Sequence, residues 1–316
     1  MSHQSSVMSH QVDLRAEVAG LELAHPVVNG SGTFDAIAAQ RAFGPAVRDR
    51  FPFSAFVSKT ITTEPRAGNP PPRLYETPAG MINSIGLPNK GLDGFLASDL
   101  PELAELPVPL IVSVMGRSHE EFVRLVEGVA PREEVAGLEL NVSCPNVDSG
   151  LIVGEEPEET LTLVRTLRGL TAKPLIVKLT PNVADPGAVA RAAEQQGADA
   201  VSLINTLKAT AVDSTTFRPW LGAGRGGLSG PAVRAIALEQ VRSVAAAVAI
   251  PVIGMGGIES GEDAAQFIAA GATAVAVGTA SFRDPLAGER VRIELGEELH
   301  RGGFGGIAEI RGRAGA

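Results

Sequence analysis

The stretch PVIGMGGIESGEDAAQFIAAGATAVAVGT, residues 251–279, holds two short apolar runs on either side of a longer amphipathic one. Pro251–Met255 and Ala274–Gly278 are almost continuously apolar, which is typical of strands that are buried on both faces and therefore of parallel sheets. Between them, Gly261–Ala270 has helical periodicity, and Gly271 stands where glycine commonly follows a helix. The stretch therefore predicts a strand–helix–strand unit with parallel strands.

The same unit recurs along the chain. Gln196-Gly197-Ala198-Asp199-Ala200 closely matches Ala270-Gly271-Ala272-Thr273-Ala274, and each turns from a helix end directly into a strand. Six further strands are predicted at Pro26–Asn29, Ala55–Lys59, Pro109–Val114, Gly137–Asn141, Leu175–Leu179 and Ala200–Asn205, and four further helices at Ser118–Val129, Pro157–Leu170, Pro186–Gln196 and Pro231–Ala247. Eight strands with interleaved helices predict a (β/α)₈ barrel. A doubly wound open sheet is the alternative, less favoured because no Gly-x-Gly-x-x-Gly follows an early strand.

Two segments outside this alternation complete the expected fold. Val12–Val18 with Leu21–Leu23 predicts a short N-terminal hairpin at the bottom face of the barrel. Ile61–Asp93 is long and rich in Pro and Gly, and a loop of this length in a compact domain is usually functional. In a barrel it would lie over the catalytic face. We expect residues 1–11 to be a disordered polar tail and residues 12–316 to form one barrel domain.

The composition limits the classes of function. The 316 residues carry 27 Lys and Arg against 36 Asp and Glu, a net charge of −9, which argues against a general nucleic-acid binder. The single cysteine excludes an internal disulfide and an all-cysteine metal site, and it fits a reducing, cytosolic compartment. No apolar run reaches the roughly 18 residues of a membrane span. His3 and His10 are expected to be solvated, and no metal site is predicted.

Glycine-rich turns follow the last two predicted strands. Met255-Gly256-Gly257-Ile258 follows strand seven, Gly278-Thr279 follows strand eight, and Gly226–Gly230 is a third glycine turn that opens the helix before strand seven. Each alone is compatible with a simple tight turn. Together they lie where barrels commonly bind phosphate through backbone N–H groups and helix N-termini. They therefore predict a ligand that carries a phosphate.

Polar side chains gather at the carboxyl ends of the predicted strands, where barrel active sites form. Lys59 and Lys178 each end an apolar run, and because lysine is rarely buried without a partner, they indicate anion stabilisation rather than simple snorkelling. Asparagine amides offer donors and acceptors that suit a flat heterocycle with N–H and C=O edges, although each alone could be a turn residue. These asparagines are Asn83, Asn141, Asn146 and Asn205, and the other strand-end candidates are Asn29, Ser31 and Ser113.

Cys144 lies just past the fourth predicted strand in Asn141-Val142-Ser143-Cys144-Pro145-Asn146. A lone cysteine is often an inert buried thiol, but a Pro-bounded loop at the catalytic face favours a catalytic role. A nucleophile would need a histidine partner, and His25, His119 and His300 do not stand at strand carboxyl ends. A general base with a tuned pKa fits better.

The ordered set of motifs over nearly the whole chain resembles dihydroorotate dehydrogenase, the flavin enzyme of pyrimidine synthesis. The matching motifs are Ser31–Phe34, Lys59-Thr60, Glu64–Arg66, Gly68–Pro70, Asn83–Asn89, Asn141–Asn146, Val177–Leu179, Asn205-Thr206, Gly227–Pro231, Gly254–Gly257 and Val277–Thr279.

The resemblance implies an FMN-binding barrel that oxidises dihydroorotate to orotate. Cys144 would remove the C5 proton while the C6 hydride passes to FMN. The residues expected to bind FMN are Ser31, Lys59, Thr60, Ser113, Asn141, Lys178, Ile204, Gly230, Gly256, Gly257, Gly278 and Thr279. Those expected to bind the substrate are Lys59, Asn83, Ser84, Ile85, Gly86, Leu87, Asn141, Asn146, Asn205 and Thr206.

The resemblance also indicates a class within the family. Membrane-bound members have serine in place of Cys144 and an N-terminal extension, so this chain is more similar to the soluble class 1. Glu76–Met81, Asn205-Thr206 and Gly254–Gly257 resemble class 1B, whose members pass electrons to NAD⁺ through a partner subunit with FAD and a [2Fe–2S] cluster. Class 1 also implies a homodimer.

Two sequence features depart from class 1B. Ser113 stands where its members usually have asparagine beside the flavin, and Val147–Glu156 is unusually acidic. A fumarate-linked class 1A enzyme and another FMN barrel acting on pyrimidines therefore stay open as alternatives. A non-catalytic scaffold would be expected to have lost Lys59, Cys144 and Lys178.

Overall fold

The computed structural model describes residues 12–142 and 156–315. Its central sheet has eight strands in the order β3-β14-β13-β10-β9-β8-β7-β4, and every neighbouring pair is parallel. The strands are β3 (Val27–Asn29), β4 (Phe56–Val57), β7 (Leu110–Val114), β8 (Val135–Asn141), β9 (Leu175–Lys178), β10 (Ala200–Leu203), β13 (Val252–Met255) and β14 (Ala274–Val277). Each of them coincides with one of the apolar runs predicted to be a strand.

The buried side chain of Asn29 links the two strands at the ends of this order. Its Nδ2 donates to the carbonyl of Val57 at 2.8 Å, and its Oδ1 accepts from the N–H of Val57 at 2.8 Å. One amide therefore bonds both backbone groups of Val57, as a neighbouring strand would. The Ser54 N–H adds a bond to the Val27 carbonyl at 3.0 Å. These contacts join β3 to β4, and the predicted (β/α)₈ barrel is confirmed.

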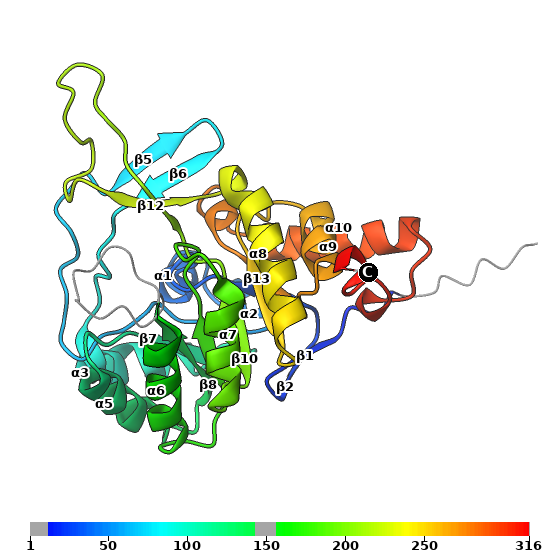
Figure 1. Cartoon of the computed structure of the whole chain (residues 1–316), viewed down its shortest axis with the longest axis horizontal. Helices are drawn as coiled ribbons and strands as arrows, with labels where there is room; N and C mark the ends of the chain where they lie inside the picture. Colours follow the sequence, from blue (N-terminus) through cyan, green and yellow to red (C-terminus); the bar gives the residue numbers. More distant parts are fainter. Residues whose placement is uncertain (1–11, 143–155, 316) are drawn as a thin grey trace, which may run out of the picture.

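Helices surround the barrel and alternate with its strands (Figure 1). The longer ones are α1 (Ala36–Phe43), α5 (His119–Val129), α6 (Pro157–Arg168), α7 (Pro186–Gln195), α8 (Arg234–Ala247), α9 (Gly261–Ala269) and α10 (Ala287–Arg301). Shorter turns are α2 (Ala46–Asp49), α3 (Gly91–Gly94), α4 (Leu100–Leu103), a π-helical turn at Phe95–Asp99 and 3₁₀ turns at Pro231–Val233, Thr279–Phe282, Ile307–Glu309 and Arg313–Gly315.

Local sequence explains where several helices begin. The Ser118 side chain accepts from the N–H of Glu121 and caps α5. Ser260 and Asp263 form a reciprocal capping box on α9, which satisfies N–H groups that a helix start leaves unpaired. The predicted helix Pro231–Ala247 begins with a 3₁₀ turn before α8.

The predicted N-terminal hairpin is present. Strands β1 (Ala16–Val18) and β2 (Leu21–Leu23) pair antiparallel. Val18 and Leu23 are buried and pack in one apolar cluster with barrel residues that include Val28 and Ile111. The hairpin therefore covers the amino-terminal end of the barrel, opposite the end at which ligands bind in this fold.

A four-stranded antiparallel sheet covers the other end of the barrel, and the sequence did not predict it. Its order is β11 (Leu207–Ala209), β12 (Gly226–Ser229), β6 (Gly80–Asn83) and β5 (Leu74–Thr77). Ile61–Asp93 is therefore a loop that contains a hairpin. The predicted glycine turn at Gly226–Gly230 is a strand that turns only at Gly230, which has a φ of +92°. Figure 1 shows β5, β6 and β12 at the top of the view and the β1–β2 hairpin at the bottom.

The expected polar tail and most of Val147–Glu156 lie outside the described residues. Within the described ranges, no helix combines the length and the apolar character that crossing a membrane requires.

Candidate active site

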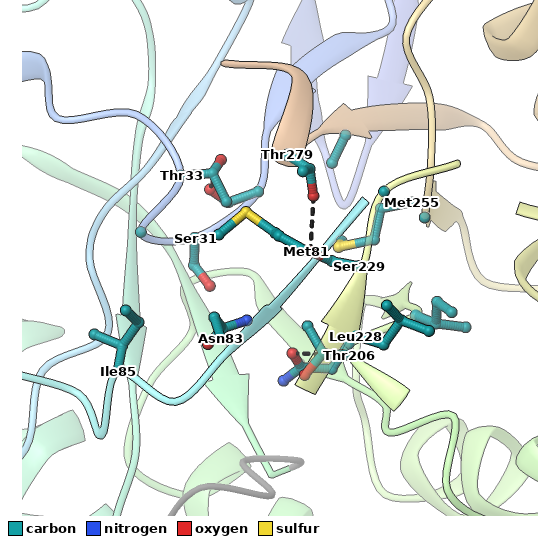
Figure 2. Close-up of a pocket in the computed structure, with 18 of the residues that line it drawn as sticks. Ser31, Thr33, Met81, Asn83, Ile85, Thr206, Leu228, Ser229, Met255 and Thr279 are labelled. Atoms are coloured by element: carbon teal, nitrogen blue, oxygen red, sulfur yellow. Dashed lines mark hydrogen bonds between the residues drawn. The ribbon is translucent and has the colours of Figure 1, made fainter. Parts of the chain in front are cut away.

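A cavity of about 380 Å³ lies between the carboxyl ends of the barrel strands and the four-stranded sheet (Figure 2). Its size is within the usual range for small-molecule sites. The predicted residues that line it are Ser31, Lys59, Thr60, Asn83, Ile85, Gly86, Leu87, Asn141, Lys178, Ile204, Asn205, Thr206, Gly230, Gly256, Gly257, Gly278 and Thr279. Residues far apart in the sequence thus meet at one place, because parallel strands bring their carboxyl ends to the same face.

Two described residues among those expected to bind FMN or substrate do not line the cavity, and neither does the strand-end candidate Asn29, which bonds to Val57. Ser84 is fully buried, and its Oγ accepts from Asn69 Nδ2 at 3.0 Å. Its neighbours Asn83 and Ile85 face the cavity, and successive side chains of extended chain point to opposite sides. Ser113 is also fully buried, and its hydroxyl bonds to Thr60 inside the barrel.

Two further candidates, Cys144 and Asn146, lie outside the described residues. Their expected roles remain predictions from the sequence.

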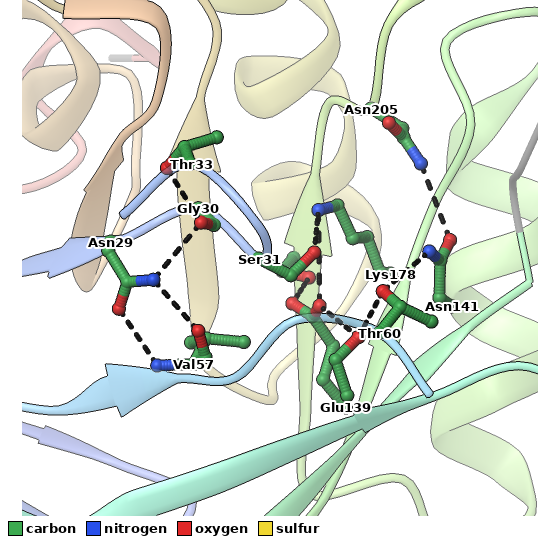
Figure 3. A network of polar contacts seen from close by, with 12 residues as sticks. Asn29, Gly30, Ser31, Thr33, Val57, Thr60, Glu139, Asn141, Lys178 and Asn205 are labelled. Carbon is green, nitrogen blue, oxygen red and sulfur yellow. Dashed lines mark hydrogen bonds and ion pairs between the residues drawn. The ribbon is translucent and has the colours of Figure 1, made fainter. Parts of the chain in front are cut away.

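The floor of the cavity holds a buried ion pair that the sequence analysis did not find. Lys178 is 5% exposed, and its Nζ donates to Ser31 Oγ at 2.9 Å. The Glu139 carboxylate, on the neighbouring strand, lies 3.9 Å from the same Nζ. The signal for Glu139 was a single acidic residue within the otherwise apolar run Gly137–Asn141. The pair holds the lysine ammonium at a fixed place beneath the cavity (Figure 3).

Backbone turns after β13 and β14 form one wall of the cavity. Gly257 has a φ of +81°, and a Cβ there would lie 2.7 Å from the Gly230 carbonyl oxygen, so only glycine fits this turn. Among the described residues, a Cβ on Gly278 would meet a single atom within 4 Å, Thr33 Cγ2 at 3.6 Å. Because Gly278 lines the cavity, such a Cβ would take up space that belongs to a ligand. These turns form a cradle in which a phosphate can approach the backbone closely.

The roof of the cavity comes from the four-stranded sheet. Met81 and Leu228 supply apolar surface, and Asn83 Nδ2 donates to the Gly227 carbonyl at 3.3 Å. Thr279 Oγ1 donates to Ser229 Oγ at 2.9 Å, which connects the roof to the cradle (Figure 2). The sequence analysis missed the roof residues Leu74, Met81, Leu228 and Ser229 because it did not predict their sheet.

The other lining residues that the sequence analysis missed are Gly30, Gly32, Thr33, Val233, Met255, Ala276 and Phe282. Most of them are next to predicted site residues in the sequence. The turns in which they stand were the signal that could have identified them as site residues.

A (β/α)₈ barrel with a cavity that holds lysines and amides at the carboxyl ends of its strands has the architecture of a barrel enzyme. Comparison with known proteins narrows this class. The family model described as dihydroorotate dehydrogenase matches residues 13–299. The chain belongs to the dihydroorotate dehydrogenase family, whose enzymes are oxidoreductases.

Individual relatives agree with this assignment. A protein of Geobacter metallireducens named dihydroorotate dehydrogenase B (NAD(+)), catalytic subunit, is 46% identical over 301 residues, which cover 95% of this chain and 97% of the relative. A protein of Solibacter usitatus with the provisional name dihydroorotate dehydrogenase A (fumarate) is 45% identical over 303 residues, covering 95% and 97%. The crystal structure of DHODH from Eimeria tenella, in complex with ferulenol, matches the fold with a TM-score of 0.78 at 24% identity, covering 98% of this chain and 90% of that one.

Proposed function

We propose that this chain oxidises dihydroorotate to orotate with bound FMN, in the synthesis of pyrimidines. The observation that supports this most directly is the convergence of the lysines, the amides and the glycine cradle on one cavity. The glycine cradle at one wall suits the phosphate of a ligand, and the lysine and amide groups at the floor suit a heterocyclic ring at its other end.

The residues present fit FMN. The turns at Gly256-Gly257 and Gly278-Thr279 would hold its phosphate, since a Cβ on Gly278 would enter the cavity. Lys59, Thr60, Asn141 and Lys178 would contact its ring system, whose N–H and C=O edges need both donors and acceptors. When bound, FMN supplies a two-electron acceptor for the substrate's hydride.

The chain's own residues bind the substrate and remove its proton. Asn83, Asn141, Asn205 and Thr206 line the cavity and would hold the pyrimidine ring and its carboxylate. Cys144 would take the proton from C5, and the hydride leaves C6, so that a C5–C6 double bond forms and the electrons balance. The buried ammonium of Lys178 would stabilise negative charge on the reduced ring.

We further propose that electrons continue to NAD⁺ through a partner subunit that carries FAD and a [2Fe–2S] cluster, and that the catalytic chain forms a homodimer. The name of the Geobacter metallireducens relative supports the partner. A cluster of this kind needs four ligands, normally cysteines, and this chain has one cysteine, so the cluster would lie on the partner. The name of the Solibacter usitatus relative keeps fumarate as the alternative acceptor, and turnover with fumarate as sole acceptor would distinguish the two.

Substitution of Cys144 tests the assignment of the base. The Cys144→Ala variant should keep its FMN and lose nearly all turnover, because no group remains to take the C5 proton. The Cys144→Ser variant should turn over slowly and recover at high pH, since a hydroxyl is a weaker base than a thiolate. Orotate formation in a pH series measures both. Unchanged turnover in Cys144→Ala would contradict the assignment.

A further inference from the structure

A carboxylate is buried among the strands just below the cavity floor. Glu139 on β8 is 2% exposed, and it accepts one hydrogen bond from Ser113 Oγ on β7 and one from Ser202 Oγ on β10, each at 3.1 Å. Barrel interiors are normally filled with bulky branched residues, and a buried charge is costly unless it is paired and hydrogen-bonded. The ion pair with Lys178 accounts for the buried negative charge, but it does not explain why two serine hydroxyls donate to the carboxylate.

The carboxylate fixes the direction of the hydrogen bonds that lead away from it. An ionised carboxylate can only accept, so Ser113 must use its one hydrogen on Glu139. The Ser113 oxygen, 2.9 Å from Thr60 Oγ1, therefore accepts from Thr60. With its own hydrogen given to Ser113, Thr60 Oγ1 accepts from Asn141 Nδ2 at 3.2 Å.

The same direction continues to two side chains that line the cavity. Because Asn141 turns its Nδ2 towards Thr60, its Oδ1 faces Asn205, whose Nδ2 lies 3.4 Å away (Figure 3). Asn205 Oδ1 in turn accepts from the Thr206 N–H at 2.9 Å. The chain of donors thus runs from Asn205 through Asn141, Thr60 and Ser113 to Glu139.

We propose that Glu139 is a positioning residue that, as the final acceptor of this chain, fixes the amide orientation of Asn141 for the substrate. Asn205 is held from the other end, because the Thr206 backbone N–H can only donate to its Oδ1. The inference rests on the proposed function, in which the Asn141 amide holds the pyrimidine ring. With a group at position 139 that can also donate, Ser113 and Thr60 can reverse their hydrogen bonds, and the Thr60 hydrogen then points at Asn141 Nδ2, which is itself a donor. An amide that turns over would set a carbonyl oxygen against a substrate oxygen, and such a mismatch lowers affinity.

An alternative is that Glu139 acts on the cavity only through Lys178. Ser113 separates the two possibilities, because its hydroxyl bonds to Thr60 and Glu139, whereas Lys178 Nζ donates to Ser31. Removing the Ser113 hydroxyl cuts the chain while the carboxylate and the ammonium stay in place.

The first experiment is a double-mutant cycle on orotate affinity. The dissociation constant of orotate for the oxidised, FMN-loaded protein is measured from the change in flavin absorbance. Glu139→Gln and Ser113→Ala should each weaken binding about tenfold, a coupling typical of residues in one network. In the Ser113→Ala background, Glu139→Gln should change the constant less than about twofold. The control is Glu134→Gln, an exposed residue just before the same strand, which should leave the constant unchanged.

Two results of the cycle would overturn the proposal. An equal loss from Glu139→Gln in both backgrounds would show that the carboxylate acts through Lys178. No loss from Glu139→Gln would show that it only fills the barrel interior.

A second experiment does not depend on the substrate. The side-chain NH₂ resonances of Asn141 are recorded by NMR on the purified chain without orotate. They should shift in Glu139→Gln and in Ser113→Ala but not in Glu134→Gln. Unchanged resonances would overturn the proposal even if orotate binds. A wild-type, FMN-loaded protein that does not bind orotate would instead contradict the proposed function, and the NMR result would still decide on the hydrogen-bond chain.

Discussion

At the scale of single residues, Gly278 tests the cradle without disturbing the fold. Of the atoms in the part of the chain that the structure describes, a Cβ at this position contacts only Thr33 Cγ2, at 3.6 Å, so Gly278→Ala should fold normally. Because the added methyl group would stand in the cavity, we expect FMN to bind about tenfold or more weakly, as measured by fluorescence titration.

Gly296→Ala is the matched control for this substitution. Gly296 lies on α10, away from the cavity. Its Cβ would lie 3.8 Å from Leu14 Cδ1, which is an ordinary van der Waals contact. It should leave FMN affinity unchanged. Equal affinity in the Gly278→Ala variant would mean that the phosphate lies elsewhere.

His25 gives the protein a predictable dependence on pH. Burial and the nearby positive charge of Arg292 lower the pKa of His25 from 6.5 to about 4, and its Nδ1 accepts from the Val27 N–H at 3.3 Å, which suits the neutral ring. The unfolded chain therefore binds more protons than the folded one between pH 6.5 and 4. The contribution of His25 to the free energy of unfolding is therefore fully present above pH 6.5 and is lost as the pH falls towards 4.

The His25→Asn variant checks this dependence. Asparagine can accept from the N–H two residues ahead, as histidine does here, but it does not titrate. Melting temperatures of both proteins between pH 7.5 and 4.5 should converge as the pH falls. Curves that stay parallel would show that His25 takes up its proton equally in both states.

At the scale of elements, Asn29 determines how β3 meets β4. The Asn29→Ala variant leaves both backbone groups of the buried Val57 without the bonds that Asn29 makes. Unsatisfied buried backbone groups are costly, so we expect a loss of about 2–5 kcal/mol in unfolding free energy, seen as a lower urea midpoint. An unchanged midpoint would show that the joint between these strands does not depend on the side chain.

The roof sheet shows where prediction from the sequence stopped. Strands β11 and β12 are short and contain Leu207–Ala209 and the glycines at 226 and 227, so they lack the apolar alternation that indicates a strand. Glycine is required at position 226 because a Cβ there would lie 2.3 Å from the Asn83 carbonyl oxygen on the neighbouring strand. The segment forms a strand because its backbone approaches a neighbouring backbone closely, although its composition alone suggests a turn.

The direction of individual side chains was the second feature that could not be predicted from the sequence. Ser84 was expected in the site from the resemblance of its motif, but one step along an extended chain turns its side chain away from the cavity. Ser113 was expected there from its place at a strand end, but its hydroxyl bonds to Thr60 and Glu139 inside the barrel. Glu139 was overlooked for a related reason, since its role depends on Ser113, Ser202 and Lys178, which come from three other strands. Such contacts follow from the register between strands rather than from local pattern.

At the scale of the whole molecule, the barrel and most of the site followed from one regularity. Apolar runs buried on both faces set the eight parallel strands, and parallel strands bring their carboxyl ends together. Lys59, Asn141, Lys178 and Asn205 could therefore be assigned to one site while they were still far apart in sequence.

The central claim, that this barrel binds FMN and takes a hydride from dihydroorotate, is tested most directly by an anaerobic visible spectrum of the purified chain before and after dihydroorotate is added. We predict a yellow protein whose oxidised flavin bands bleach on addition. A yellow protein that does not bleach would contradict the substrate and favour another FMN barrel. A colourless protein that FMN does not restore would contradict the cofactor site itself.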